Sequence, residues 1–180
     1  MDAARTDFLN WPDITQRCHP PRETMTTQPP RPKPVGRSGF PHFVAITTRW
    51  MDNDVYGHLN NVVYYSFFDT AVNQFLIAQG VLDIEASASI GLVVHTQCDY
   101  FSSLSFPGEV QAGLRVTTTG SSSVTYEIGL FGAGEAMSAA CGRFVHVYVD
   151  RQTRRPVPLP EALRNALARL ETSAKGGVAP

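Results

Sequence analysis

The strongest pattern in the chain is an apolar run between residues 62 and 79. Its hydrophobic side chains recur at three- and four-residue spacings, which predicts a helix. They include Val63, Phe67, Phe68, Ala71, Val72, Phe75 and Leu76. Asn60 or Asn61 can cap its start, and Gly80 suits the left-handed position after its end. Because the helix is apolar over more than one face, we expect a sheet wrapped around it.

Five other segments are rich in β-branched and aromatic residues, mostly in alternation with polar ones. They cover residues 42–50, 89–101, 109–119, 124–131 and 137–150. Short turns separate the last four, which predicts an antiparallel meander, and Gly91 indicates a bulge or a close approach. The order of one strand, one long helix and four strands predicts an α+β fold with open sheet edges. Association with a second copy would cover such edges.

The two ends of the chain differ from this central domain, which we place at residues 41–160. Residues 1–40 are rich in proline and weakly periodic, so we expect a flexible N-terminal arm. Phe8, Leu9 and Trp11 either form a short docking patch there or belong to a mobile tail. Residues 161–180 are expected to form a short amphipathic helix, at 161–170, and a tail.

Composition narrows the class of protein. The chain has 180 residues and a formal net charge of −1, so no basic field suggests a nucleic-acid partner. The cysteines, Cys18, Cys98 and Cys141, are odd in number and widely spaced, which favours neither a disulfide framework nor a metal site. No signal core or membrane span stands out. We therefore expect a cytoplasmic protein with no membrane partner.

The loop before the long helix carries the most promising chemistry. Asp54 precedes a helix start, where unpaired backbone N–H groups can stabilise an oxyanion. A carboxylate in this place could act as a base or nucleophile, although it could instead only stabilise the helix dipole. Asp52, two residues earlier, is expected to point to the opposite side and to hold the loop.

Other residues of this loop allow several interpretations. His58 could assist Asp54, bind substrate or hydrogen-bond the loop backbone. Gly57 suits the loop geometry and is also a candidate substrate-binding residue. The spacing resembles a calcium loop but fails, because Tyr56 and Val63 occupy positions that need oxygen ligands. No G-x-S-x-G elbow is present, so a serine hydrolase is disfavoured. We expect no metal and no cofactor.

A family resemblance covers roughly residues 42–160. The segment RWMDNDVYGHLNNVVYY at 49–65 resembles the signature of hot-dog-fold acyl-CoA thioesterases of the 4-hydroxybenzoyl-CoA thioesterase type, with support from 98–110 and 113–127. The resemblance implies a hot-dog fold and a homodimer or tetramer with its active sites at the dimer interface. It implies that Asp54 is the catalytic acid, as nucleophile or general base, and that a backbone N–H near Asn61 polarises the substrate carbonyl.

The chain departs from that family's pattern in two places. Some relatives carry a histidine where this chain has Asn61, and residues 102–104 read Ser-Ser-Leu where Arg-Pro-Leu is often seen. The second departure removes a basic contact with substrate phosphate. Ser122 and Ser123 either contact the pantetheine or nucleotide of coenzyme A or form an ordinary turn. Tyr65 either lines the acyl pocket or belongs to the core.

The function most consistent with these observations is hydrolysis of an acyl or aroyl coenzyme A thioester to a free acid and a thiol. An acyl-carrier-protein thioesterase is a second hypothesis, and it would recognise a protein through surface charge. A non-catalytic acyl-CoA-binding module is a third, disfavoured by the carboxylate at the helix start. A hot-dog dehydratase would need a paired histidine and acid, for which the sequence shows no clear arrangement.

Overall fold

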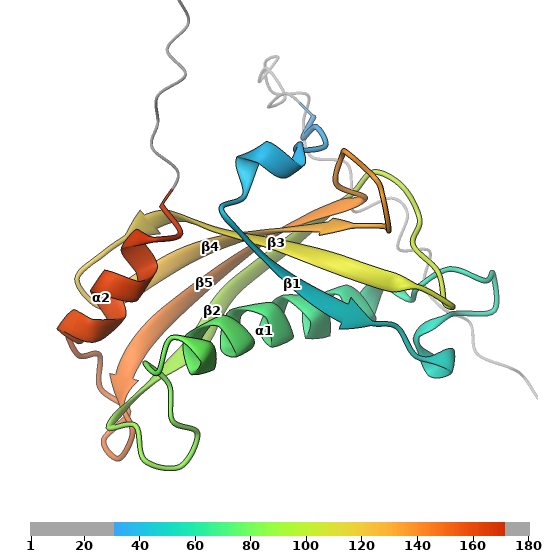
Figure 1. Cartoon of the computed structure of the whole chain (residues 1–180). Helices are drawn as coiled ribbons and strands as arrows, with labels where there is room; N and C mark the ends of the chain where they lie inside the picture. The colour runs from blue at the N-terminus through green and yellow to red at the C-terminus, as the bar shows by residue number, and fades with distance from the viewer. Residues whose placement is uncertain (1–30, 172–180) are drawn as a thin grey trace, which may run out of the picture. The chain divides into compact units, whose positions relative to one another are not determined.

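The computed structural model describes residues 31–171 and contains one antiparallel sheet packed against one long helix (Figure 1). Its strands are β1 (His42–Thr47), β2 (Ser89–Tyr100), β3 (Glu109–Thr119), β4 (Ser123–Phe131) and β5 (Ala140–Asp150). Its helices are α1 (Asn61–Ala78) and α2 (Glu161–Ala168), with single 3-10 turns at Arg37–Gly39 and Trp50–Asp52. The predicted α+β arrangement of five strands around a long helix is therefore confirmed.

The strand order corrects one expectation. The sheet runs β1-β3-β4-β5-β2, so only β3, β4 and β5 form a meander, and the predicted pairing of β2 with β3 is wrong. Helix α1 carries the chain from β1 at one edge to β2 at the other. Residues 101–108 then lead back to β3. Among the described strands, β2 pairs only with β5, and its large apolar residues Leu92, Val93 and Val94 are exposed.

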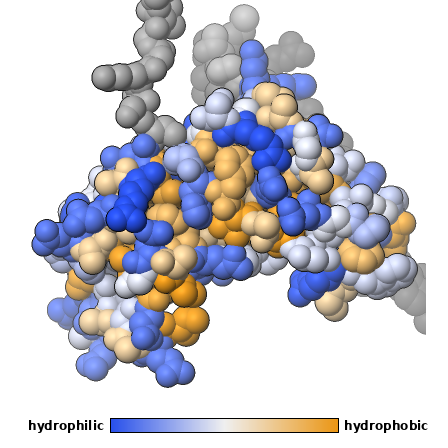
Figure 2. All heavy atoms as spheres, viewed as in Figure 1, coloured by the Kyte–Doolittle hydropathy of each residue, from blue (hydrophilic) through white to orange (hydrophobic). Residues whose placement is uncertain are grey.

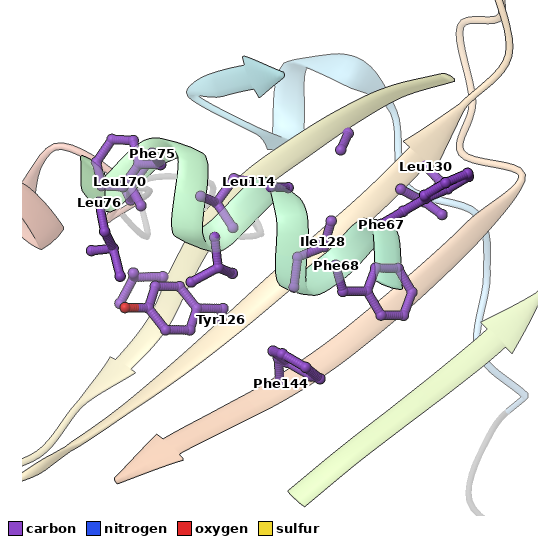
Figure 3. Packing of buried hydrophobic residues seen from close by; sticks show 14 of the residues in the cluster. Phe67, Phe68, Phe75, Leu76, Leu114, Tyr126, Ile128, Leu130, Phe144 and Leu170 are labelled. Carbon is purple, nitrogen blue, oxygen red and sulfur yellow. The ribbon is translucent and has the colours of Figure 1, made fainter. Parts of the chain in front are cut away.

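Helix α1 lies across the sheet with its aromatic residues pointing into the core (Figure 3). Phe68 is fully buried, and its ring centroid lies 6.3 Å from that of Phe144 on β5. Complete burial of a side chain of this size contributes about 2–3 kcal/mol to folding. The strands contribute the facing side chains Leu114, Tyr126, Ile128 and Leu130. The wide apolar surface of the helix is thus matched by a wide, curved sheet.

Both predicted ends of α1 are confirmed. Asn60 Oδ1 accepts a hydrogen bond from the Val62 N–H at 3.2 Å, which satisfies one of the free donors of the first turn. Helix α1 ends at Ala78, and Gly80 follows in the left-handed conformation at a φ of +67°. No helix within residues 31–171 is both long and hydrophobic enough to cross a membrane.

The end of the N-terminal arm, at residues 37–40, packs on the sheet. Phe40 is 4% exposed, and its ring centroid lies 5.7 Å from that of Phe131. Arg37 Nε donates a hydrogen bond to the Glu135 carbonyl at 2.6 Å. The proposed boundary at residue 40 stays a prediction. The suggested docking patch at Phe8, Leu9 and Trp11 lies outside the described residues, as does Cys18.

Candidate functional site

The loop between β1 and α1 is built around a buried carboxylate. Asp52 is 1% exposed, and its side chain accepts hydrogen bonds from the backbone N–H, Nε and Nη2 of Arg49 at 2.7–3.0 Å. Burial opposes ionisation of Asp52, but the hydrogen bonds from Arg49 outweigh it and hold the pKa of this carboxyl below its usual value. The Asp52 carbonyl also accepts from the Asn60 N–H at 2.8 Å. Asp52 therefore holds the loop against the start of the helix, as expected.

Asp54 lies in the same loop but is half-buried, and its carboxylate is oriented by the backbone. Oδ1 accepts hydrogen bonds from the N–H groups of Tyr56 at 2.8 Å and His58 at 3.3 Å. The Asp54 N–H donates to the His58 carbonyl at 2.8 Å, which closes the turn. Among residues 31–171 no hydrogen bond is formed to Oδ2. One oxygen thus fixes the side chain while the other remains available to a ligand.

Gly57 serves this turn through its backbone. Its φ is +81°, a left-handed conformation that other residues adopt at a cost of about 1 kcal/mol or more. Its N–H donates to the Asp54 carbonyl at 3.2 Å. It also borders a hollow beside Trp50 and Phe106. The expectation that Gly57 serves loop geometry agrees with this conformation.

A groove of about 410 Å³ opens beside Asp54. It is lined by Asp54, His58, Leu59, Asn61, Tyr64, Tyr100, Phe101, Ser102 and Ser103. The three residues proposed as catalytic, Asp54, His58 and Asn61, therefore face one space. Ser102 and Ser103 lie at its edge, where the family pattern often has arginine and proline. The groove thus combines one carboxylate, a helix start and an aromatic wall.

Tyr100 is a groove residue that sequence reasoning missed. Its hydroxyl donates to the Asn61 carbonyl at 3.2 Å, and its ring centroid lies 5.0 Å from that of Tyr64. Burial raises the pKa of the Tyr100 phenol, so the hydroxyl stays protonated at neutral pH. The sequence did offer one signal for this role, because Tyr100 lies at the end of a predicted strand and directly before a turn. The contact joins the end of β2 to the start of α1.

The start of α1 provides a backbone donor at Asn61, a residue that lines the groove. The Val62 N–H is capped by Asn60 Oδ1, and the Val63 N–H donates to the Asn60 carbonyl at 2.9 Å. Within the described residues the Asn61 N–H has no hydrogen-bond partner. Helix N-termini carry partial positive charge, so this N–H is suited to a developing oxyanion.

Three residues expected to bind substrate lie elsewhere in the chain. Tyr65 packs edge-on against Phe68 at 5.8 Å between centroids and does not line the groove. Ser122 and Ser123 lie at the β3–β4 turn, where the Ser122 carbonyl accepts from the Tyr148 N–H at 2.7 Å. That turn is at the opposite end of β4 from the groove. The structure therefore does not bring these serines to Asp54 of the same chain.

Metal chemistry has no obvious location in the described part of the chain. Among residues 31–171 no three side chains of histidine, cysteine, aspartate or glutamate are grouped closely enough to hold a metal ion. Burial raises the pKa of the Cys98 thiol to about 11, so it is neutral at physiological pH. Asp54 is thus the carboxylate that lines the groove.

Comparison with known proteins identifies a family and similar solved structures. Residues 48–167 match the model of the thioesterase-like superfamily. The PA5185 protein from Pseudomonas aeruginosa is 53% identical, with a TM-score of 0.77 over 79% of this chain and 100% of that chain. A thioesterase from Thermus thermophilus, solved with coenzyme A and zinc, is 31% identical, with a TM-score of 0.58 over 73% of this chain and 95% of its own.

A curated relative matches a shorter segment. The YsmA protein of Bacillus subtilis is 25% identical over 89 residues, which cover 49% of this chain and 60% of YsmA. The match to the family model contains both the loop around Asp54 and the whole of α1. The expected hot-dog fold is confirmed, and so is the expected class of thioester hydrolase at the level of the family. The narrower 4-hydroxybenzoyl-CoA type stays a prediction. The chain belongs to the thioesterase-like superfamily.

Proposed function

We propose that the protein hydrolyses an acyl-CoA thioester in the groove beside Asp54. The observation that carries this proposal is that Asp54 and Asn61, the first residue of α1, line the same groove. Hydrolysis of a thioester needs a base or nucleophile on one side of the carbonyl carbon and a donor for the carbonyl oxygen. These two groups meet that requirement without a metal.

The reaction follows from these positions. Asp54 Oδ2 removes a proton from a water molecule as the water oxygen attacks the thioester carbon. The carbonyl oxygen becomes an oxyanion and accepts a hydrogen bond from the Asn61 N–H. When the intermediate collapses, the C–S bond breaks, and the departing thiolate takes the proton from Asp54. The products are a carboxylic acid and a free thiol, and Asp54 returns to its charged form.

A second route uses the same carboxylate as a nucleophile. Asp54 would attack the carbonyl carbon and release the thiolate, and water would then hydrolyse the mixed anhydride. The two hydrogen bonds to Oδ1 favour either route, because they hold the side chain in one orientation. His58 contributes its N–H to this orientation and lines the groove, so we assign it a positioning role rather than that of the base.

Coenzyme A is the preferred carrier of the acyl group. The related thioesterase from Thermus thermophilus was solved with coenzyme A, which supports this choice. At about 410 Å³ the groove can hold a thioester and part of the pantetheine arm, so the nucleotide would lie outside it. An acyl carrier protein presents the same arm, and this carrier is the alternative.

Assembly as a homodimer is part of the proposal. Strand β2 forms one edge of the sheet, and its exposed apolar residues Leu92, Val93 and Val94 lie in the middle of that edge. Such an edge invites pairing with another strand. A twofold dimer in which two β2 strands pair antiparallel would continue the sheet and cover these residues.

Thiol release from matched thioesters tests the proposal. The full-length protein is assayed with short, medium, long and aromatic acyl-CoAs and with the same acyl groups on an acyl carrier protein. We expect turnover of at least one acyl-CoA, with a higher kcat/KM than for its carrier-protein counterpart. Higher kcat/KM on the carrier protein would favour the alternative carrier. Tight acyl-CoA binding with no turnover of any thioester would favour a binding module.

A further inference from the structure

A second cavity, of about 370 Å³, lies at the other end of α1 from Asp54. Its walls include Leu76 of α1, Leu82 of the following connection, Gly91 of β2, and His146 and Tyr148 of β5. In Figure 2 hydrophobic residues reach the surface at the lower left, where the C-terminal end of α1 and this connection lie in Figure 1. Its volume is within the range of small-molecule pockets, and nothing in the proposed reaction yet uses it.

The cavity is lined by the buried imidazole of His146. His146 is 3% exposed, and its Nε2 has no hydrogen-bond partner among the described residues. Buried polar atoms are normally paired, and Nδ1 is the nitrogen of this ring that lies next to Gly91 on the cavity wall. Burial lowers the pKa of His146 to about 4, so the ring is neutral and offers one donor and one acceptor. Tyr148 adds a hydroxyl, which lies 3.1 Å from that of Tyr126.

Gly91 keeps this polar wall accessible. A Cβ atom at position 91 would approach His146 Nδ1 to 3.0 Å and the Tyr148 ring to 3.3 Å. Both residues therefore border the cavity because β2 has no side chain there. The remaining charged group, Arg151, donates to the carbonyls of Ser87 and Ile84 at 2.6 and 3.0 Å. These bonds use Nε and Nη2 of its guanidinium, so the neutral imidazole and the tyrosine hydroxyl are the polar groups that we assign to an uncharged ligand.

Within one chain, this cavity lies far from Asp54. The helix from Asn61 beside the groove to Leu76 at the cavity rises by about 22 Å. Strand β2 connects the same two places, because its first residues line the cavity and its last residue, Tyr100, lines the groove. If β2 pairs antiparallel with β2 of a second copy, the two strands run in opposite directions along the shared edge. The start of one strand then lies beside the end of the other, one strand spacing of about 4.8 Å away.

We propose that this cavity receives the far end of the acyl group whose thioester lies at Asp54 of the second copy. This inference rests on the proposed function. The neutral imidazole and the neighbouring tyrosine hydroxyl select acyl groups that carry a hydroxyl or oxo group at that end. Each active site therefore combines the carboxylate of one chain with the His146 cavity of the other.

Substrate pairs test the selectivity. Medium-chain acyl-CoAs with and without a terminal hydroxyl are compared for wild type, His146→Phe and the control His42→Phe. His42 is a half-buried histidine on β1 that borders neither space. Loss of one hydrogen bond changes binding by about 2- to 12-fold, so His146→Phe should reduce the preference for the hydroxylated acyl group by that factor. His42→Phe should keep it. A preference that is unchanged in His146→Phe overturns the proposal.

Mixed dimers test the contribution of both chains. Ala88 lines the cavity, so Ala88→Phe should block it and abolish turnover of medium-chain substrates, while Asp54→Asn removes the base. A mixed dimer of these two variants has one site with an intact Asp54 and an open cavity. Random reassociation should restore about a quarter of wild-type activity. If each cavity serves its own chain, no mixed site is intact, and the absence of recovery contradicts the proposal.

Failure of the proposed hydrolysis can be distinguished from failure of the proposed acyl cavity. If wild type hydrolyses no acyl-CoA, calorimetric titration with a medium-chain hydroxy acid tests the cavity without turnover. Weaker binding by His146→Phe than by His42→Phe then supports the cavity as an acyl site. Equal binding by wild type and both variants, with thermal denaturation confirming that all are folded, overturns it.

Discussion

The Oδ1 atom of Asp54 lies 2.8 Å from the backbone nitrogen of Tyr56, in a turn that also holds the His58 N–H at 3.3 Å. A short carboxylate tied to its own backbone loses little conformational entropy when substrate binds. In Asp52, two residues earlier, both carboxylate oxygens accept hydrogen bonds from Arg49 instead. Two acids in one loop thus have different environments, and these environments suggest different roles.

Asp52→Asn should lower stability. The substitution weakens the charge-assisted hydrogen bonds with Arg49, so we expect the melting temperature to fall by about 3–8 °C. The folded-state pKa of Asp52 is depressed, so its stabilising effect is present above the unfolded value of 3.8 and is lost as pH falls through the folded-state pKa. Thermal denaturation at neutral and acidic pH measures both effects. An unchanged melting temperature at neutral pH would contradict this role.

His146→Phe should change the response of stability to acid. The pKa of the buried imidazole is lowered from 6.5 to about 4, so the unfolded chain binds a proton more readily. Stability should therefore be highest above pH 6.5 and should fall as pH drops towards 4, by up to about 3 kcal/mol from this group.

Urea denaturation across this pH range gives the measurement. In His146→Phe the decline between pH 6.5 and 4 should be shallower, because the group that gains the proton on unfolding is gone. His42 has a half-buried ring and a pKa lowered by burial, so His42→Phe serves as a control with a smaller effect. Equal slopes for wild type and His146→Phe would show that His146 is not the group responsible.

Val94→Lys should disrupt association. Val94 is 59% exposed on the edge strand, beside the irregularity between Val93 and His95. A lysine on a strand edge opposes pairing with a second copy. Light scattering should show a dimer or larger assembly for wild type and a smaller species for the variant. Thr118→Lys, on the exposed surface of β3, is the matched control and should keep the wild-type mass.

The periodicity of the sequence was sufficient for much of the fold. It predicted α1 with its Asn60 cap, because both the apolar spacing and the cap are local properties. It also predicted the bounds of β3. It failed for the neighbours of β2, because pairing across a sheet depends on the route of the connections rather than on the strand's own pattern.

The candidate site was predictable to a similar degree. Asp54, His58 and Asn61 are close in sequence, so their shared groove follows from one loop and one helix start. Tyr100 was missed because it reaches Asn61 only through tertiary packing of β2. Ser122 and Ser123 were suggested as coenzyme A contacts because they lie at a predicted turn, and their distance from Asp54 in one chain depends on the same global arrangement.

The central claim is that Asp54 carries out the chemistry, and the comparison of Asp54→Asn with Asp69→Asn tests it directly. Asp69 is an exposed acid on α1 that bonds only to Asn73 among the described residues. On the best acyl-CoA substrate, Asp54→Asn should lower kcat by about 100-fold or more, with substrate binding and melting temperature preserved. Asp69→Asn should keep wild-type kcat. Full activity in a folded Asp54→Asn variant would contradict the account and leave His58 as the next group to examine.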